Sequence, residues 1–265
     1  MVAHLGSWQA PPLALGGLGL AAVLFAQAFV RLRRRGRADL TPASRAVLFG
    51  LALALAVVVL VSPLDRVAER SLLSAHMLQH VLLGDAAPAL GLVAIRGPLL
   101  FFALPPAVLG PLARSPRVRA ALATLSRPRV AWTLWAANLG VWHVPALYDA
   151  ALRHPLLHDL EHACWLLAGL LVWTLLVDPA GRGRVSVGGR IALAVALFAA
   201  GQALSDVLVF SFRPLYPAYE GAYGISGQTD QQLAGLVMMV EQLLTLGTCV
   251  ALLLRPRWAR RAALA

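Results

Sequence analysis

The sequence predicts an all-α membrane protein, a bundle of seven transmembrane helices with its N-terminus outside the cytoplasm and its C-terminus inside. Three observations support this prediction. Hydrophobic residues make up 59% of the 265 residues and charged residues only 13%, about half the charged share of a soluble domain. Seven apolar stretches are each roughly long enough to cross a bilayer. The basic residues gather between these stretches, and the two cysteines lie inside them, so a disulfide scaffold is not expected.

Each predicted span is an apolar stretch close to the roughly 20 residues that a crossing helix needs. The shorter apolar segment 98–113 is interrupted by Pro105-Pro106, so we expect it to be re-entrant or to lie on the membrane surface. No soluble domain is recognisable, and residues 1–265 are expected to form one membrane domain. The predicted spans are 11–30, 45–62, 71–95, 130–148, 156–177, 190–212 and 231–254.

The arginines predict the orientation of the bundle. The chain has no lysine, so all 23 basic residues are arginines. Nineteen of them lie after the first, third, fifth and seventh spans, whereas Arg66, Arg70, Arg153 and Arg213 lie on the other side. By the positive-inside rule the nineteen face the cytoplasm. The charge of +11 therefore reflects membrane topology, and nucleic acid is not an expected partner. The longest outside loop, 213–230, is expected to cap the outer surface.

Five of the seven histidines lie within the first two or three turns of three spans, counted from the outside. The histidines of each i,i+4 pair share one helix face, and the fifth joins them from a helix that runs the opposite way. Ionisable groups inside a membrane usually face the bundle interior, where these imidazoles could surround one metal ion or two close ions. The five are His76, His80, His143, His158 and His162.

Met238 of the last span lies at roughly the depth of His80. A thioether together with imidazoles favours copper(I) as the metal. The alternative for Met238 is ordinary packing, because methionines commonly fill the cores of helix bundles.

Several carboxylates lie in or near the same layer. Glu161, Asp206 and Glu241 could accept a hydrogen bond from a ligating histidine and so fix its tautomer. Asp85 lies past the middle of the membrane, where it is either a structural hydrogen-bonding residue or part of a proton path.

Four motifs between about residues 40 and 254 carry a family resemblance. They are H-M-L-Q-H-V-L-L at 76–83, W-H-V-P-A-L-Y at 142–148, H-D-L-E-H at 158–162 and D-Q-Q-L-A-G-L-V-M at 230–238. With these motifs the chain resembles the integral-membrane CtaG-type assembly factors of haem-copper cytochrome c oxidase. The resemblance implies a non-enzymatic, multi-pass protein of the bacterial cytoplasmic membrane, surrounded by lipid, whose partners are the oxidase catalytic subunit or other oxidase assembly proteins.

The resemblance and the chemistry of the side chains together predict transient copper binding near the outer face and delivery of that copper to the oxidase. The expected metal ligands are His76, His80, His143, His158, His162 and Met238. The expected hydrogen-bonding partners of these ligands are Glu161, Asp206 and Glu241.

Other functions also fit part of the pattern. A di-iron hydroxylase or desaturase uses histidine boxes, although such boxes generally face the cytoplasm. A haem-binding electron carrier would use two histidines as axial ligands. A metal-free scaffold would use the histidines as hydrogen bonds between helices. The H-x-x-E-H form at 158–162 also occurs in inverted zinc peptidases, but nothing else in the sequence supports a peptidase.

Overall fold

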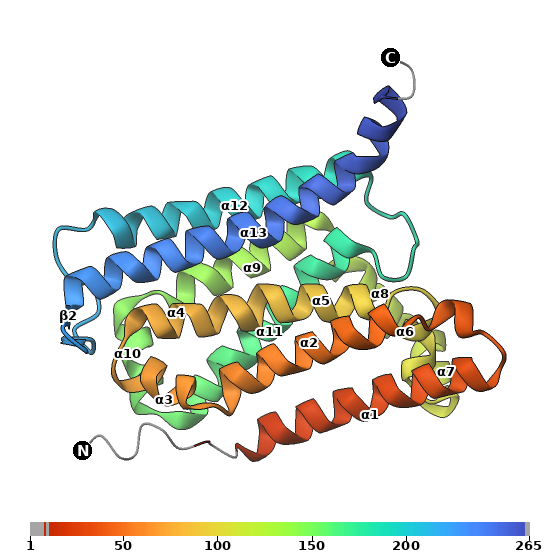
Figure 1. The fold of residues 1–265 in the computed structure, drawn as a ribbon, viewed down its shortest axis with the longest axis horizontal. Helices are drawn as coiled ribbons and strands as arrows, with labels where there is room; N and C mark the ends of the chain where they lie inside the picture. Colours follow the sequence, from red (N-terminus) through yellow and green to blue (C-terminus); the bar gives the residue numbers. More distant parts are fainter. Residues whose placement is uncertain (1–7, 9–10, 263–265) are drawn as a thin grey trace.

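The chain folds almost entirely into helices. The structure, a computed structural model, describes residue 8 and residues 11–262, with side chains up to Arg255. Long helices lie roughly side by side, with α12 and α13 along one flank and α1 and α2 along the other (Figure 1). The described elements are α1 (Pro12–Arg34), η1 (Ala38–Leu40), α2 (Ala43–Leu60), α3 (Pro63–Arg70), α4 (Leu73–Val81), η2 (Leu82–Ala86), α5 (Ala87–Ala94), α6 (Pro98–Ala103), α7 (Pro106–Arg114), α8 (Pro116–Leu125), α9 (Pro128–Trp142), α10 (Pro145–Arg153), α11 (Pro155–Val177), α12 (Val187–Phe210), β1 (Gly221–Ala222), β2 (Ile225–Ser226) and α13 (Gly227–Ala262).

Six helical segments of the described chain are long and apolar enough to cross a membrane. Each overlaps one of the expected spans, so the prediction of an all-α membrane protein is confirmed. The six are Pro12–Arg34, Ala38–Leu60, Leu73–Ala94, Pro155–Val177, Val187–Phe210 and Gly227–Arg255.

The remaining expected span, 130–148, is not one continuous helix, and its predicted boundary was wrong. Helix α9 ends at Trp142, and α10 begins at Pro145. A proline forces the residue before it out of the helical region, and Val144 accordingly has φ −66° and ψ 119°. His143 therefore caps the end of α9 and does not lie inside a span. The 15 residues of α9 extend only about 22 Å.

Segment 98–113 forms two short helices, α6 and α7, that break before Pro106. This agrees with the expectation that the segment does not cross the membrane as one helix. Helix α6 packs against α1, where the Gln27 side chain donates a hydrogen bond of 2.6 Å to the Ala103 carbonyl. Phe25 of α1 stacks on Phe49 of α2, with ring centroids 4.0 Å apart.

The main core lies between α4, α9, α11, α12 and α13. Helix α13 packs along α12 and α4, while α11 packs against α9, η2 and α5. Trp135, Trp165 and Trp173 are among its largest buried side chains. These helices bury their inner faces against one another, whereas only 11% of the apolar stretch of α1 is buried. The exposed apolar surface of α1 is the face that a lipid environment would cover.

The helix from α4 to α5 is interrupted at η2, a π-helical turn. Pro88 follows this turn and lacks the N–H that would donate to the carbonyl of Gly84. Helix α11 approaches at the same point: a Cβ added at Gly169 would overlap the Gly84 carbonyl oxygen. The π-turn and the two glycines therefore let the backbones of η2 and α11 come into direct contact.

The short helix α3 connects α2 to α4 outside the candidate spans. Ser62 caps its N-terminus by accepting a hydrogen bond from the Leu64 N–H. The Gln79 side chain on α4 donates to Asp65 at 2.7 Å and to the Val59 carbonyl at 2.8 Å. Burial raises the pKa of Asp65 to about 6, and the nearby negative charge of Glu69 contributes to the increase. One polar network thus fixes α3 against α4.

Replacing Gly169 by alanine is expected to destabilise the bundle by about 1–3 kcal/mol, because the new methyl group forces α11 away from Gly84. Gly140→Ala is the matched control, since a Cβ at that helical glycine would meet nothing within 4 Å. Thermal unfolding of both purified variants in the same detergent measures the effect. Equal melting temperatures for the two variants would contradict the close packing of η2 and α11.

Asp65→Asn is expected to stabilise the protein increasingly as the pH rises. The folded state binds the Asp65 proton more tightly than the unfolded state does, so the wild type loses stability between pH 4 and pH 6. The amide carries no charge and still accepts from Gln79. The advantage of the variant should therefore be absent below pH 4 and reach up to about 3 kcal/mol above pH 7. Melting temperatures measured from pH 4 to pH 8 test this, and a constant difference would refute it.

Candidate metal centre

Four buried histidines and one buried glutamate gather between α4 and α11. Helix α4 supplies His76 and His80, and α11 supplies His158, Glu161 and His162. Ring centroids lie 4.3 Å apart within the α4 pair and 4.2 Å apart within the α11 pair. Across the two helices, His76 is 5.3 Å from His158 and His80 is 5.7 Å from His162. The i,i+4 pairs thus face each other, and we call these five residues the histidine cluster.

The order of these contacts fixes the relative direction of the two helices. His76 lies opposite His158, His80 opposite His162, and Gly84 opposite Gly169. Residue numbers rise together along both helices, so α4–η2 and α11 run parallel. The contact of the two glycines therefore holds the helices close together about one turn beyond the cluster.

Hydrogen bonds from outside the spans determine which nitrogen of His76 carries its proton. The Tyr219 hydroxyl donates its single proton to the Ala68 carbonyl, at 2.6 Å. Its oxygen must then accept from Nδ1 of His76, at 2.9 Å. Nε2 of a neutral His76 consequently carries a lone pair, and it lies 2.9 Å from Nε2 of His80.

His158 is oriented in the same way. Its Nδ1 lies 3.2 Å from the Glu69 carboxylate on α3, which only accepts, so Nδ1 carries the proton. The hydrogen bond from His158 holds the pKa of Glu69 below its usual value, although burial opposes this effect. Nε2 of His158 is left without a hydrogen-bond partner. A nearby carboxylate that fixes the tautomer of a histidine in this way is typical of metal-binding imidazoles.

Several more buried polar atoms of the cluster have no hydrogen bond among the described residues. They are Nε2 of His162 and both oxygens of Glu161, one of which lies 3.5 Å from Nε2 of His80. Buried polar atoms without partners are costly, and neutral imidazoles with a carboxylate are the usual ligands of Zn²⁺ and copper. Two sets of potential ligand atoms each lie within 4.8 Å of one another: His76, His158 and His162, and His76, His80 and Glu161. The cluster therefore fits a metal ion.

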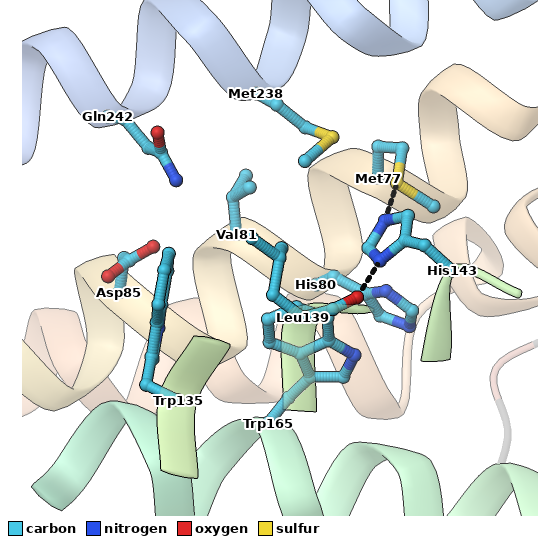
Figure 2. Close-up of a pocket in the computed structure, with 10 residues that line it drawn as sticks. All are labelled: Met77, His80, Val81, Asp85, Trp135, Leu139, His143, Trp165, Met238 and Gln242. Atoms are coloured by element: carbon cyan, nitrogen blue, oxygen red, sulfur yellow. Dashed lines mark hydrogen bonds between the residues drawn. The ribbon is translucent and has the colours of Figure 1, made fainter. Parts of the chain in front are cut away.

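His143 lies beside the histidine cluster, in neither of these two sets. At the end of α9 its Nδ1 is 2.8 Å from the Leu139 carbonyl, and its Nε2 is 3.3 Å from the sulfur of Met77. It borders a small cavity, also lined by His80 and Met238, that Figure 2 shows between α4, α9, α11 and α13. The five histidines therefore do not share one position: four form the cluster, and His143 lies with two methionines.

The three carboxylates expected to orient ligating histidines lie in three different places. Glu161 is inside the cluster, where its position suits a ligand. Asp206 is exposed on α12 and accepts a hydrogen bond of 2.7 Å from Gln202. Glu241 is buried on α13, where it interacts electrostatically with Asp85. Among the described residues no hydrogen bond or ion pair joins Asp206 or Glu241 to a histidine.

Asp85 accepts a hydrogen bond of 2.9 Å from the indole of Trp173 on α11. Of the two alternatives for this residue, the structure supports structural hydrogen bonding, and a role in a proton path stays untested. His154 is exposed in the turn before α11, and His4 lies outside the described residues.

Sequence reasoning missed Tyr219 and Glu69, which orient His76 and His158. Both lie beyond the candidate spans, and their contacts with the cluster span 143 residues for Tyr219 and His76 and 89 positions for Glu69 and His158. No local pattern marks either residue, although loop 213–230 was expected to cap this end of the bundle. Tyr219 does so with a side chain that is only 3% exposed.

Comparison with known protein families gives one match, and it covers most of the chain. The family model of the cytochrome c oxidase caa3 assembly factor (Caa3_CtaG) matches residues 23–261. Searches of curated proteins and of solved structures find nothing that matches. The matched region contains all of the histidine cluster, His143 and Met238. The chain belongs to the cytochrome c oxidase caa3 assembly factor family.

Proposed function

We propose that this assembly factor binds copper at the histidine cluster and delivers it to a haem-copper cytochrome c oxidase. The observation that carries the proposal is the set of buried, unpaired acceptor atoms on His158, Glu161 and His162, which lie beside the facing nitrogens of His76 and His80. A cation would satisfy these atoms together. Family membership supplies the oxidase as the object of assembly, and the soft to borderline ligands favour copper as the cargo.

We propose further that α9 is the seventh crossing and that the cluster opens toward the outside. The arginine pattern places the start of α4 and the start of α11 at the outer surface. His76 then lies about 5 Å along α4 from its first residue, and His162 about 10 Å along α11. A site at this depth is close to the outer surface and inside the membrane that also holds the oxidase. It can therefore exchange metal with a partner embedded beside it.

The chemistry of the cluster suits a carrier. Neutral imidazoles bind copper without first losing a proton, and Glu161 supplies a negative charge that offsets the charge of the ion. Tyr219 and Glu69 hold His76 and His158 through their outer nitrogens, so both rings are already oriented before metal arrives. Preorganisation of this kind raises affinity because little freedom is lost on binding.

The geometry supports the alternatives less well. Histidines that only join helices would have paired nitrogens, whereas Nε2 of both α11 histidines has no partner. Ring centroids only 4.2–5.7 Å apart leave no slot for a porphyrin between two axial histidines. The histidine boxes of di-iron hydroxylases and desaturases generally face the cytoplasm, whereas the arginine pattern favours the outer side for the cluster.

Replacing His80 and His162 together by alanine is expected to remove the copper bound at the cluster and to abolish oxidase maturation while membrane insertion persists. His154→Ala is the matched control, because this histidine is exposed in the turn before α11. Copper per chain is measured on protein purified from copper-supplemented cells, and oxidase activity on the membranes. Size-exclusion profiles verify folding. Full copper occupancy in the double variant would remove the assignment.

Glu161→Gln is expected to weaken copper binding about tenfold or more without unfolding the protein, because the amide keeps the shape but loses the charge that offsets the ion. Asp159→Asn is the control, since Asp159 is an exposed carboxylate two residues away on the same helix. Competition with a copper chelator of known affinity measures both variants. If both show the affinity of the wild type, Glu161 takes no part in binding.

A further inference from the structure

The contact between His143 and Met77 joins two atoms that both carry lone pairs. The Leu139 carbonyl can only accept, so Nδ1 of His143 carries the proton of the neutral ring. Nε2 then presents its lone pair to the thioether sulfur of Met77, 3.3 Å away. That sulfur has no proton to donate. Both side chains are buried, His143 at 7% exposure and Met77 at 1%.

Such a contact gains its full stability when a cation accepts both electron pairs. With a neutral ring, the buried nitrogen has only a sulfur lone pair in front of it. A doubly protonated ring could donate to the sulfur, but it would bury a positive charge without an anion among the residues that touch it, which is costly. Thioether sulfur with imidazole nitrogen is a soft set that selects Cu(I) over Zn²⁺, Mg²⁺ and Ca²⁺.

A cavity adjoins this contact and brings a second sulfur to it. Met238 on α13 lines the cavity with Met77, His80 and His143. In Figure 2 the Met238 side chain reaches from α13 toward Met77 and His143, and the dashed lines mark the two contacts of His143. The cavity has room for about one water molecule, which is comparable to the size of a bare metal ion.

We propose that Met77, His143 and Met238 form a second metal position, selective for Cu(I) and separate from the histidine cluster. The site itself follows from the geometry above, whereas its part in copper delivery rests on the proposed function.

His80 connects the two positions. Its Nε2 lies in the cluster, 2.9 Å from His76, while its Nδ1 has no hydrogen-bond partner and its ring lines the cavity. A Cu(I) ion can therefore pass between the positions by exchanging ligands at His80. The ion stays monovalent throughout, so the passage needs no electron donor or acceptor.

Met77→Leu is the decisive variant, because leucine keeps the volume and apolar character of methionine but removes the sulfur. Met239→Leu is the matched control: Met239 neighbours Met238 in sequence, but its sulfur accepts a hydrogen bond of 3.4 Å from Gln202 on α12. Met238→Leu is a second test variant if Met77→Leu does not fold. The full chain in detergent is loaded with Cu(I) without oxygen or, separately, with Zn²⁺.

X-ray absorption of the copper-loaded protein and chelator competition give the readouts. At full Cu(I) loading, the proposal expects sulfur scattering from copper in the wild type and in Met239→Leu, its loss in Met77→Leu, and at least tenfold weaker binding of the second Cu(I) ion in Met77→Leu. Zn²⁺ affinity should be unchanged in Met77→Leu. Copper surrounded only by nitrogen and oxygen in the wild type would overturn the second position.

The same experiment separates this proposal from the proposed function. If Met77→Leu binds Cu(I) as the wild type does while the His80 and His162 double variant loses copper, the second position is wrong and the cluster stands. If Met77→Leu loses sulfur-bound copper while the double variant retains all the copper of the wild type, the second position stands and the cluster assignment falls. A wild type that binds no Cu(I) overturns both.

Discussion

The close approach of η2 to α11 is the constraint on which the rest of the site depends. Pro88 removes the donor that the Gly84 carbonyl would use in a regular helix, and the resulting π-turn meets Gly169, where no side chain intervenes. Because the two helices run parallel, the contact sets a register that holds along both. It places each histidine of α4 opposite a histidine of α11, one to two turns nearer the N-termini of the two helices. A larger residue at Gly169 would separate the two histidine pairs.

Two side chains from segments between the spans orient the histidines that the helices bring together. Tyr219 and Glu69 accept hydrogen bonds from Nδ1 of His76 and His158, so the Nε2 lone pairs point inward. The bond of His158 has a cost: its inward Nε2 is buried without a donor among the described residues, and this lowers the stability of the metal-free protein. The same cost becomes a gain when a cation binds, because the ion satisfies several acceptors at once. Metal binding should therefore stabilise the hydrogen bonds of Tyr219 and Glu69, because these bonds fix the tautomers that bind the metal.

The sequence was sufficient to predict the helices and the faces of α4 and α11, because apolar length and i,i+4 spacing are local properties. It could not show how far each helix is rotated about its axis. Asp206 lies at a suitable depth but on the exposed face of α12. Nor did it separate His143 from the cluster, because that depends on the helix break at Pro145 and on the sulfur of Met77. Tyr219 and Glu69 reach the cluster from distant segments, and such contacts leave no periodic pattern in the sequence.

The balance of charge predicts which of the two proposed positions binds copper more tightly. A monovalent ion in the histidine cluster is offset by the carboxylate of Glu161, which touches no other cation among the described side chains. The same ion between Met77, His143 and Met238 meets only neutral ligands and keeps its full charge in a buried place, which is less favourable. Copper should therefore bind more tightly in the cluster, and the sulfur position should hold its ion more weakly. A carrier needs both properties, because the charged position retains the ion and the neutral one lets it leave.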